Sequence, residues 1–420
     1  MPPPAGACRS RQAPASLVFD LPRPSVVFAT LPLSYCANVH PGLTVEAVCR
    51  GLTEYTQPLA SRVGPVAAGL WLPDPVAREL EANTTALAKL RETLAAAELP
   101  CYTLNAFPQG NFHDTVVKQA VYRPTWGDRS RLDYTLRCAR LLTELMPEGV
   151  QGSISTVPLA YKRDESFVGE ATAIEHLLEC AHQLDALHDE TGRVVRLAIE
   201  PEPHCHLETT DEAVAFFGRL FEAAAAAGCE AIARDHLGLC YDVCHQSVEF
   251  EDVVRSVRAL DAAGVRINKV HISCAIELTD PTDAQQRAAL ATYAEPRYLH
   301  QTFAQTTDRR IVSVADLTAE LCESPPEDFA AARRWRIHFH VPVDADRLGP
   351  LRTTRPDLSR AMAAIRELSY APHLEVETYT WSVLPGEASE SERLIEGLAR
   401  EVTATRRLID QLSAAPPAKS

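Results

Sequence analysis

The chain has 420 residues, of which 46% are hydrophobic and 23% charged, and its 56 acidic and 41 basic side chains give a net charge of −15. This composition is typical of a folded globular protein and excludes a fibrous or wholly disordered chain. The acidic balance argues against a broad nucleic-acid interface, because phosphate binding needs a basic face.

Both ends of the chain differ in composition from the rest. Residues 1–25 are rich in Pro, Ala and Arg and lack the continuous apolar stretch of a signal peptide, so we expect a disordered tail there and a second one over residues 414–420. No apolar run approaches the roughly 20 residues that a membrane span needs. Twelve cysteines at irregular spacing are typical of reduced thiols. We therefore predict a cytoplasmic protein with one domain over residues 26–413.

From Val26 onward, short apolar runs alternate with helical patterns. Seven strands are predicted first, over residues 27–36, 67–72, 101–105, 152–157, 194–200, 237–242 and 265–273. Helices are predicted between them, from the Asp74-Pro75 start signal onward and over residues 132–145, 174–187, 211–227 and 250–263. This alternation indicates βαβ units and a parallel sheet.

Two strand candidates then remain, 336–343 and 373–379, although a (β/α)8 barrel has room for only one more. We assign His373–Glu377 to the eighth barrel strand. Residues 280–343 would then be an insertion on the active-site face, followed by a helix over 357–368. A terminal helix over 389–412 would pack outside the barrel. The predicted fold class is α/β, a (β/α)8 TIM barrel with an insertion before its last strand.

Four predicted strands carry metal-competent side chains at or near their C-terminal ends, namely Glu200, Asp242, His271 and Glu377. The C-terminal ends of barrel strands open onto one face, where active sites of this fold are built. Two Glu, one Asp and one His converging there predict a site for a divalent ion such as Mn²⁺, Mg²⁺, Co²⁺ or Zn²⁺.

Several of these residues also have a purely structural interpretation. Glu202, two residues after Glu200, could be a solvated loop carboxylate. Asp242 could cap the following helix, with His245 as a partly buried histidine. His271 lies in an apolar run and could be a core histidine.

Two further pairs compete for the same roles. His338 and His340 alternate across Phe339 and would share one face of a strand, so they compete with His271 for the ligand position. Glu375 and Glu377 also share a face, and carboxylates inside a barrel need a cation or hydrogen-bond partners. At least one of the two is therefore expected to be functional.

The four strand-end motifs resemble those of the xylose isomerase-like TIM barrels, which include sugar isomerases, ketose 3-epimerases and sugar-phosphate isomerase/epimerases. They are Glu200 in Ile-Glu-Pro, Asp242-x-x-His245, His271 in Val-His-Ile, and Glu377 on the last strand. The resemblance covers roughly residues 26–385. The paired Glu375 and Glu377 and the extra His338/His340 segment depart from the epimerase pattern.

A closer resemblance is to the EboE family, TIM-barrel proteins of a bacterial metabolite-traffic gene cluster. It is carried by residues 33–42, 105–110, 240–246, 338–343 and 374–381. This resemblance implies a role in making or moving a small metabolite, with other proteins of the same pathway as partners.

The leading functional hypothesis is a metal-dependent isomerase or epimerase acting on a sugar-like metabolite through an enediolate. Glu200 and Glu377 would exchange the proton as base and acid, and His245 would assist them. The predicted substrate contacts are His338, His340, Asn105 and Trp381.

Two other function classes stay open at this stage. A non-catalytic carrier could keep the barrel pocket without turnover. An endonuclease IV-like phosphodiesterase would need further ligands and a basic groove, which the net charge of −15 disfavours. The sequence shows no Walker loop and no GxGxxG motif after a strand, so nucleotide binding is not predicted.

Overall fold

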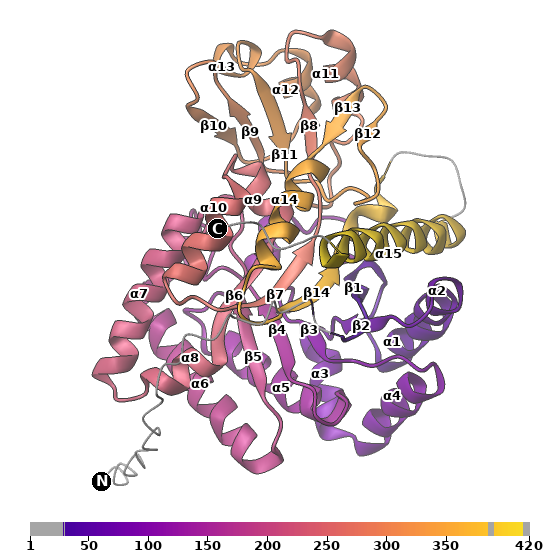
Figure 1. Ribbon diagram of the computed structural model, residues 1–420, viewed down its shortest axis with the longest axis vertical. Helices are drawn as coiled ribbons and strands as arrows, with labels where there is room; N and C mark the ends of the chain where they lie inside the picture. Colours follow the sequence, from indigo (N-terminus) through magenta and orange to yellow (C-terminus); the bar gives the residue numbers. More distant parts are fainter. Residues whose placement is uncertain (1–27, 29, 385–389, 415–420) are drawn as a thin grey trace.

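A computed structural model describes residues 28, 30–384 and 390–414, and in it eight parallel strands close into a barrel (Figure 1). The barrel strands are β1 (Ser34–Cys36), β2 (Ala67–Leu70), β3 (Thr103–Asn105), β4 (Gly152–Thr156), β5 (Val195–Ile199), β6 (Leu237–Asp242), β7 (Ile267–Ile272) and β14 (His373–Val376). Each pairs with the strand before and after it, and β14 closes the ring between β7 and β1. The predicted barrel and its eighth strand are confirmed.

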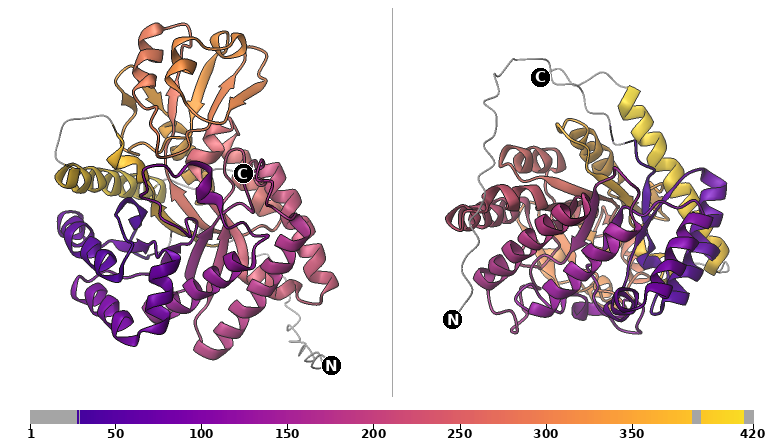
Figure 2. Two further views of the ribbon diagram at one scale, coloured as in Figure 1. Left: turned by 180° about the vertical axis from the view of Figure 1, so that it is seen from behind. Right: turned by 90° about the horizontal axis from the view of Figure 1, so that it is seen from below.

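Helices surround this barrel, as the view from below shows (Figure 2). Those of the barrel repeats are α1 (Val45–Gly51), α2 (Gln57–Val63), α3 (Asp74–Ala82), α4 (Thr84–Ala96), α5 (Arg129–Leu145), α6 (Glu170–Thr191), α7 (Thr210–Ala226), α8 (Glu230–His236), α9 (Val243–Val248), α10 (Val253–Ala262) and α14 (Arg355–Ile365). A π-helical turn, η2 (Leu52–Thr56), joins α1 to α2. The C-terminal helix α15 (Glu390–Ala414) packs against α2 and α14 on the outside, as predicted.

Local capping explains where several helices begin. The helix predicted from Asp74 divides at Asn83, whose side chain accepts hydrogen bonds from the backbone of Thr85 and Ala86 and so starts α4. Helix α7 begins with a capping box in which Thr209 and Glu212 satisfy each other's backbone N–H groups.

Between β7 and β14 the chain forms a second, antiparallel sheet that lies as a separate layer on one end of the barrel (Figure 1). Its strands are β8 (Ile276–Leu278), β9 (Thr302–Gln305), β10 (Ile311–Val314), β11 (Arg334–Ile337), β12 (Arg347–Leu348) and β13 (Leu351–Thr353), with helices α11 (Ala284–Ala291), α12 (Ala319–Glu323) and α13 (Glu327–Ala330). The unit is wider than the predicted 280–343. Its first strand β8 and its last strand β13 pair with each other, so the chain enters and leaves the second sheet through neighbouring strands.

The predicted strand over residues 336–343 is wrong in extent. Strand β11 ends at Ile337, and the backbone of His338 to Val343 leaves the sheet. His338 N–H then donates to Gln301 O at 2.9 Å and Val341 N–H to Cys274 O at 2.9 Å, so the segment runs across the barrel mouth.

Charged side chains occupy the interior of the barrel. Lys269 on β7 and Glu375 on β14 are fully buried, with Lys269 Nζ 2.9 Å from Glu375 Oε1. Glu375 also accepts hydrogen bonds from Ser34 Oγ at 2.7 Å and from Asn105 Nδ2 at 2.7 Å. A Cβ on Gly69 would lie 1.7 Å from Glu375 Oε2, so only glycine leaves room for this carboxylate. Burial would raise the pKa of Glu375, but Lys269 and His271 lower it to about 2.

Several expectations fall on the ends of the chain. The predicted disordered tails lie outside the described residues, except Ala414, which ends α15. Within the described ranges, no disulfide links the cysteines, and all of them are buried. In the same ranges, no helix combines the length and the apolar character that crossing a bilayer would require.

The buried pair leads to a stability prediction. Lys269→Met should lower the free energy of unfolding by about 3–5 kcal/mol, because it leaves Glu375 as an uncompensated buried charge. The double variant Lys269→Met/Glu375→Gln should lose clearly less, since no charge then remains. Urea unfolding followed by circular dichroism measures both, and equal losses would contradict the assignment of Lys269 as the partner of Glu375.

Candidate metal centre and active site

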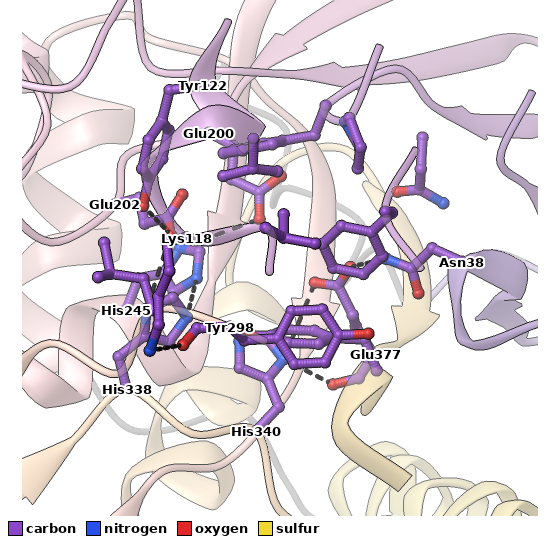
Figure 3. Close-up of a pocket in the computed structure, with 18 residues that line it drawn as sticks. Asn38, Lys118, Tyr122, Glu200, Glu202, His245, Tyr298, His338, His340 and Glu377 are labelled. Atoms are coloured by element: carbon purple, nitrogen blue, oxygen red, sulfur yellow. Dashed lines mark hydrogen bonds and ion pairs between the residues drawn. The ribbon is translucent and has the colours of Figure 1, made fainter. Parts of the chain in front are cut away.

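A cavity of about 60 Å³ lies where the barrel strands end, beneath the inserted unit. Figure 3 shows carboxylate and imidazole side chains, including Glu200, His245 and Glu377, directed toward it. Its lining residues are Asn38, Asn105, Phe107, Pro108, Phe112, Val117, Lys118, Val121, Tyr122, Glu200, Glu202, His245, Tyr298, Leu299, His338, His340, Glu377 and Tyr379. The lining therefore combines carboxylates and imidazoles with aromatic and apolar side chains, and we refer to Phe112, Tyr122, Tyr298 and Tyr379 as the aromatic wall.

The four predicted metal ligands are brought together at the base of this cavity. Glu200, Asp242, His271 and Glu377 each offer one atom, and these atoms lie within 4.8 Å of one another. His271 Nδ1 is 2.8 Å from Glu200 Oε1 and 2.9 Å from Glu377 Oε2, and Asp242 Oδ2 is 3.8 Å away. All four side chains are buried.

Backbone geometry explains this convergence. Glu200 and Glu377 come one residue after β5 and β14, and each continues the ladder by donating its N–H to a neighbouring strand, at Thr156 O and Ile272 O. Because parallel strands of a barrel end at one rim, residues far apart in the chain meet there.

Asp242 combines the structural and the functional interpretation. Its Oδ1 caps α9 by accepting the backbone N–H of His245 at 2.9 Å, and it also accepts Ser273 Oγ–H at 2.8 Å. Its Oδ2 is buried and has no hydrogen-bond partner among the described residues. One oxygen therefore starts a helix, and the other is available to a ligand.

The charges of this cluster fit a cation. Three carboxylates surround the single Nδ1 atom of His271, which can donate only one hydrogen bond. Burial would raise the pKa of Glu377, but His271 lowers it well below its usual value. A divalent ion would compensate the buried negative charge that one imidazole cannot, and carboxylate oxygens with one imidazole are suitable ligands.

Glu375 has a different role from Glu377. Its carboxylate pairs with Lys269 in the barrel interior and does not line the cavity. The sequence left open which of the two acids is functional, and the position of Glu377 at the cavity makes it the candidate.

His245, His338 and His340 all line the cavity. The ring of His245 lies 4.6 Å from that of His338, measured between centroids, and 5.5 Å from that of His340. His338 and His340 reach the cavity from the segment that crosses the barrel mouth, not from one face of a strand.

The other two predicted substrate contacts are placed differently. Asn105 borders the cavity, but its amide is engaged by Glu375, Lys269 and Ser155. Trp381 is absent from the cavity lining and donates its indole N–H to Glu401 on α15 at 2.9 Å. Its η4 turn (Tyr379–Ser382) directs Tyr379 inward instead.

Some site residues were missed from the sequence. Lys269 shares the inward face of β7 with His271, and this alternation was a usable signal. Asn38 donates from Nδ2 to Glu377 Oε1 at 3.1 Å and lies in the 3₁₀ turn η1 (Ala37–Val39); it falls within the stretch 33–42 that carries the family resemblance, but no strand or ligand pattern singled it out as a site residue.

The loop after β3 contributes Phe112 and Tyr122 of the aromatic wall to the cavity lining. This loop contains η3 (Lys118–Tyr122) and is fastened to the inserted unit. Lys118 Nζ donates to Asp316 Oδ2 and to Tyr298 O, both at 2.6 Å. Tyr122 donates to Glu202 Oε1 at 2.7 Å, and burial raises the pKa of Glu202 to about 7.

Comparisons with known proteins give a likeness in fold. No protein-family model matches the chain. No curated protein matches it either. Similar solved structures include a xylose isomerase-like TIM barrel protein from Mycobacterium smegmatis in complex with magnesium, at 12% identity over 92% of this chain and 98% of that one, TM-score 0.49. A second is the IOLI protein with a binding zinc atom, at 13% identity over 92% of this chain and 100% of that one, with a TM-score of 0.47. A third is a xylose isomerase domain-containing protein from Salmonella typhimurium, at 14% identity over 90% of this chain and 98% of that one, with a TM-score of 0.42. The metals belong to those proteins, and the barrel assignment here rests on the strand order itself.

The cluster predicts metal-dependent stability. Mn²⁺ added to chelator-treated protein should raise the melting temperature, because an ion that binds only the folded state stabilises it by mass action. Glu377→Gln should weaken Mn²⁺ binding by roughly 100-fold or more, since even outer partners of ligands contribute about 10–100-fold. Calorimetric titration measures this, and unchanged affinity would contradict the assignment of Glu377.

Trp381 provides a matched control. Trp381→Phe should lower the free energy of unfolding by about 1–3 kcal/mol, because it removes one donor from buried Glu401. It should leave Mn²⁺ affinity unchanged, since the indole does not border the cavity. If Trp381→Phe lost Mn²⁺ affinity but kept the stability of the wild type, Trp381 would belong to the metal site and not to the contact with Glu401.

Proposed function

We propose that the chain is a divalent-metal-dependent enzyme of the isomerase or epimerase type, acting on a small sugar-like metabolite. The observation that carries the proposal is the convergence of Glu200, Asp242, His271 and Glu377 at the base of a cavity. These four residues would hold the ion. When bound, it would polarise a substrate carbonyl and so acidify the neighbouring C–H bond.

Proton transfer falls to the two glutamates. His271 holds Glu200 and Glu377 at 2.8 and 2.9 Å from one nitrogen, so both carboxylates border the same small volume. The lowered pKa of Glu377 keeps it ionised and able to accept the proton α to the carbonyl. Removal of this proton by Glu377 would leave the substrate as an enediolate, and Glu200 would deliver a second proton, which it must already carry, to that carbon from the other side of the cluster, while Glu377 keeps the first.

Asn38 and the aromatic wall assist this chemistry. Asn38 Nδ2 donates to Glu377 Oε1, which leaves Oε2 directed toward His271. Phe112, Tyr298 and Tyr379 line the cavity and pack together, with ring centroids 5.0–5.5 Å apart. They would exclude water, which protects an enediolate from side reactions.

The resemblance to the EboE family supports a metabolite in biosynthesis or traffic as the substrate. A carrier on the same barrel is the rival, since the same pocket would bind without turnover. A nucleic-acid substrate is not proposed, because the net charge is −15 and aromatic and apolar side chains make up much of the cavity lining.

Hydrogen exchange tests the proposal. Manganese-loaded protein, incubated in D₂O with a panel of aldoses, ketoses and their phosphates, should introduce deuterium at the carbon next to the carbonyl of its substrate. Mass spectrometry or proton NMR detects the label. Glu200→Gln and Glu377→Gln should reduce the exchange by roughly 100-fold or more, as loss of a general base or acid does, and Trp381→Phe should not. Ligands that raise the melting temperature without any exchange would favour the carrier.

A further inference from the structure

Three histidines of the cavity remain after the first cluster is assigned, and their ring orientations are fixed. His245 Nδ1 lies 2.9 Å from Pro201 O, His340 Nδ1 lies 2.9 Å from Glu377 O, and His338 Nδ1 lies 2.7 Å from Gln301 Oε1. Carbonyl oxygens only accept hydrogen bonds, so each Nδ1 must carry the proton.

The orientation of Gln301 is itself determined. Its Nε2 donates to Pro203 O at 3.1 Å and to the hydroxyl of Tyr122 at 3.0 Å, which directs Oε1 toward His338. The neutral tautomer of all three imidazoles therefore leaves Nε2 unprotonated.

The three histidines line the cavity, and their Nε2 atoms lack hydrogen-bond donors to pair with. His245 Nε2 and His338 Nε2 are 3.1 Å apart, so two lone pairs confront each other in the neutral state. His340 Nε2 is buried and has no hydrogen-bond partner within the described part of the chain. Two nitrogens bound to one tetrahedral zinc would be about 3.3 Å apart, given Zn–N bonds of about 2.0–2.1 Å.

Asp242 links these histidines to the first cluster. Its unpartnered Oδ2 lies 3.8 Å from His340 Nε2 and 3.8 Å from His271 Nδ1. Ligand atoms of Asp242, His245 and His340 lie within 4.8 Å of one another, as do those of Glu202, His245 and His338.

We propose that His245, His338 and His340, with Asp242 as a shared carboxylate, form a second divalent-cation site beside the first. The first site is rich in carboxylates, which suit Mg²⁺ and Mn²⁺, whereas the second is rich in imidazole nitrogen, which suits Zn²⁺ or Co²⁺. The Nδ1–H bonds to carbonyl oxygens are the outer contacts that metal-binding histidines use to fix their rings. In this arrangement His338 and His340 reach the substrate through the ion and not directly.

The rival without an ion is an extra proton on His245. A cationic His245 would donate from Nε2 to His338 Nε2, and Asp242 and Glu202 would stabilise its charge. This alternative leaves His340 Nε2 and Asp242 Oδ2 without partners, whereas a second ion engages both.

Metal stoichiometry distinguishes the two. The full chain is stripped with a chelator, equilibrated with excess Zn²⁺, desalted and analysed by plasma mass spectrometry. Wild type should retain two zinc ions per chain. His338→Ala and His340→Ala should each retain one, and Glu377→Gln should also retain one, now at the histidines. Mg²⁺ titrated alone should fill one site.

His236→Gln is the matched control, because His236 is a buried histidine that binds Val195 O outside the cavity. It should retain two zinc ions. A visible Co²⁺ absorption that persists in Glu377→Gln and disappears in His340→Ala would give the same answer spectroscopically.

One zinc ion per wild-type chain would overturn the second site, whatever the variants do, and so would two ions in both histidine variants. The inference does not rest on the proposed reaction. Two ions without deuterium exchange would contradict only the reaction, and exchange with a single ion would contradict only the second site.

Discussion

The ion pair between Lys269 and Glu375 is the interaction on which the rest of the barrel interior depends. Both side chains are fully buried, and Ser34, Asn105 and Ser155 complete the hydrogen bonds around them, so strands β1, β3, β4, β7 and β14 are tied together. Lys269 is the only buried lysine among the residues that the structure describes, and its ammonium group is already paired with Glu375. The carboxylates one layer above must be neutralised in another way.

That upper layer explains the chemistry of the site. Glu200, Asp242 and Glu377 end or follow three strands and meet around one imidazole nitrogen of His271. In a buried environment such an excess of carboxylates is costly without a cation. The three histidines beside these carboxylates also lack partners, because their unprotonated nitrogens need a cation or a proton. Asp242 lies between the two groups and belongs to both.

The inserted unit covers part of this rim and contributes Tyr298, Leu299, His338 and His340 to the cavity lining. It supplies His338 and His340 from a segment that leaves the sheet after β11, and it holds the loop after β3 through Lys118. The histidine pair was expected from strand alternation, and the two side chains do meet at the cavity, although the backbone there is not a strand. Their convergence comes from the path of the chain across the barrel mouth, which no local periodicity encodes. Trp381 was predicted as a substrate contact, but its indole N–H binds the buried Glu401 on α15 and the residue does not line the cavity.

Period and spacing in the sequence determined the eight-stranded barrel, the place of the insertion before the last strand, and four of the residues at its rim. These features are local, since a strand that stops on a carboxylate or an imidazole is visible in the chain itself. Tertiary structure alone decided that Glu375 belongs to Lys269 while Glu377 faces the cavity, and that Asn105 serves the interior network. It also decided the tautomers of His245, His338 and His340. These outcomes depend on partners up to 341 positions apart, as between Ser34 and Glu375, and only closure of the barrel brings such partners into contact.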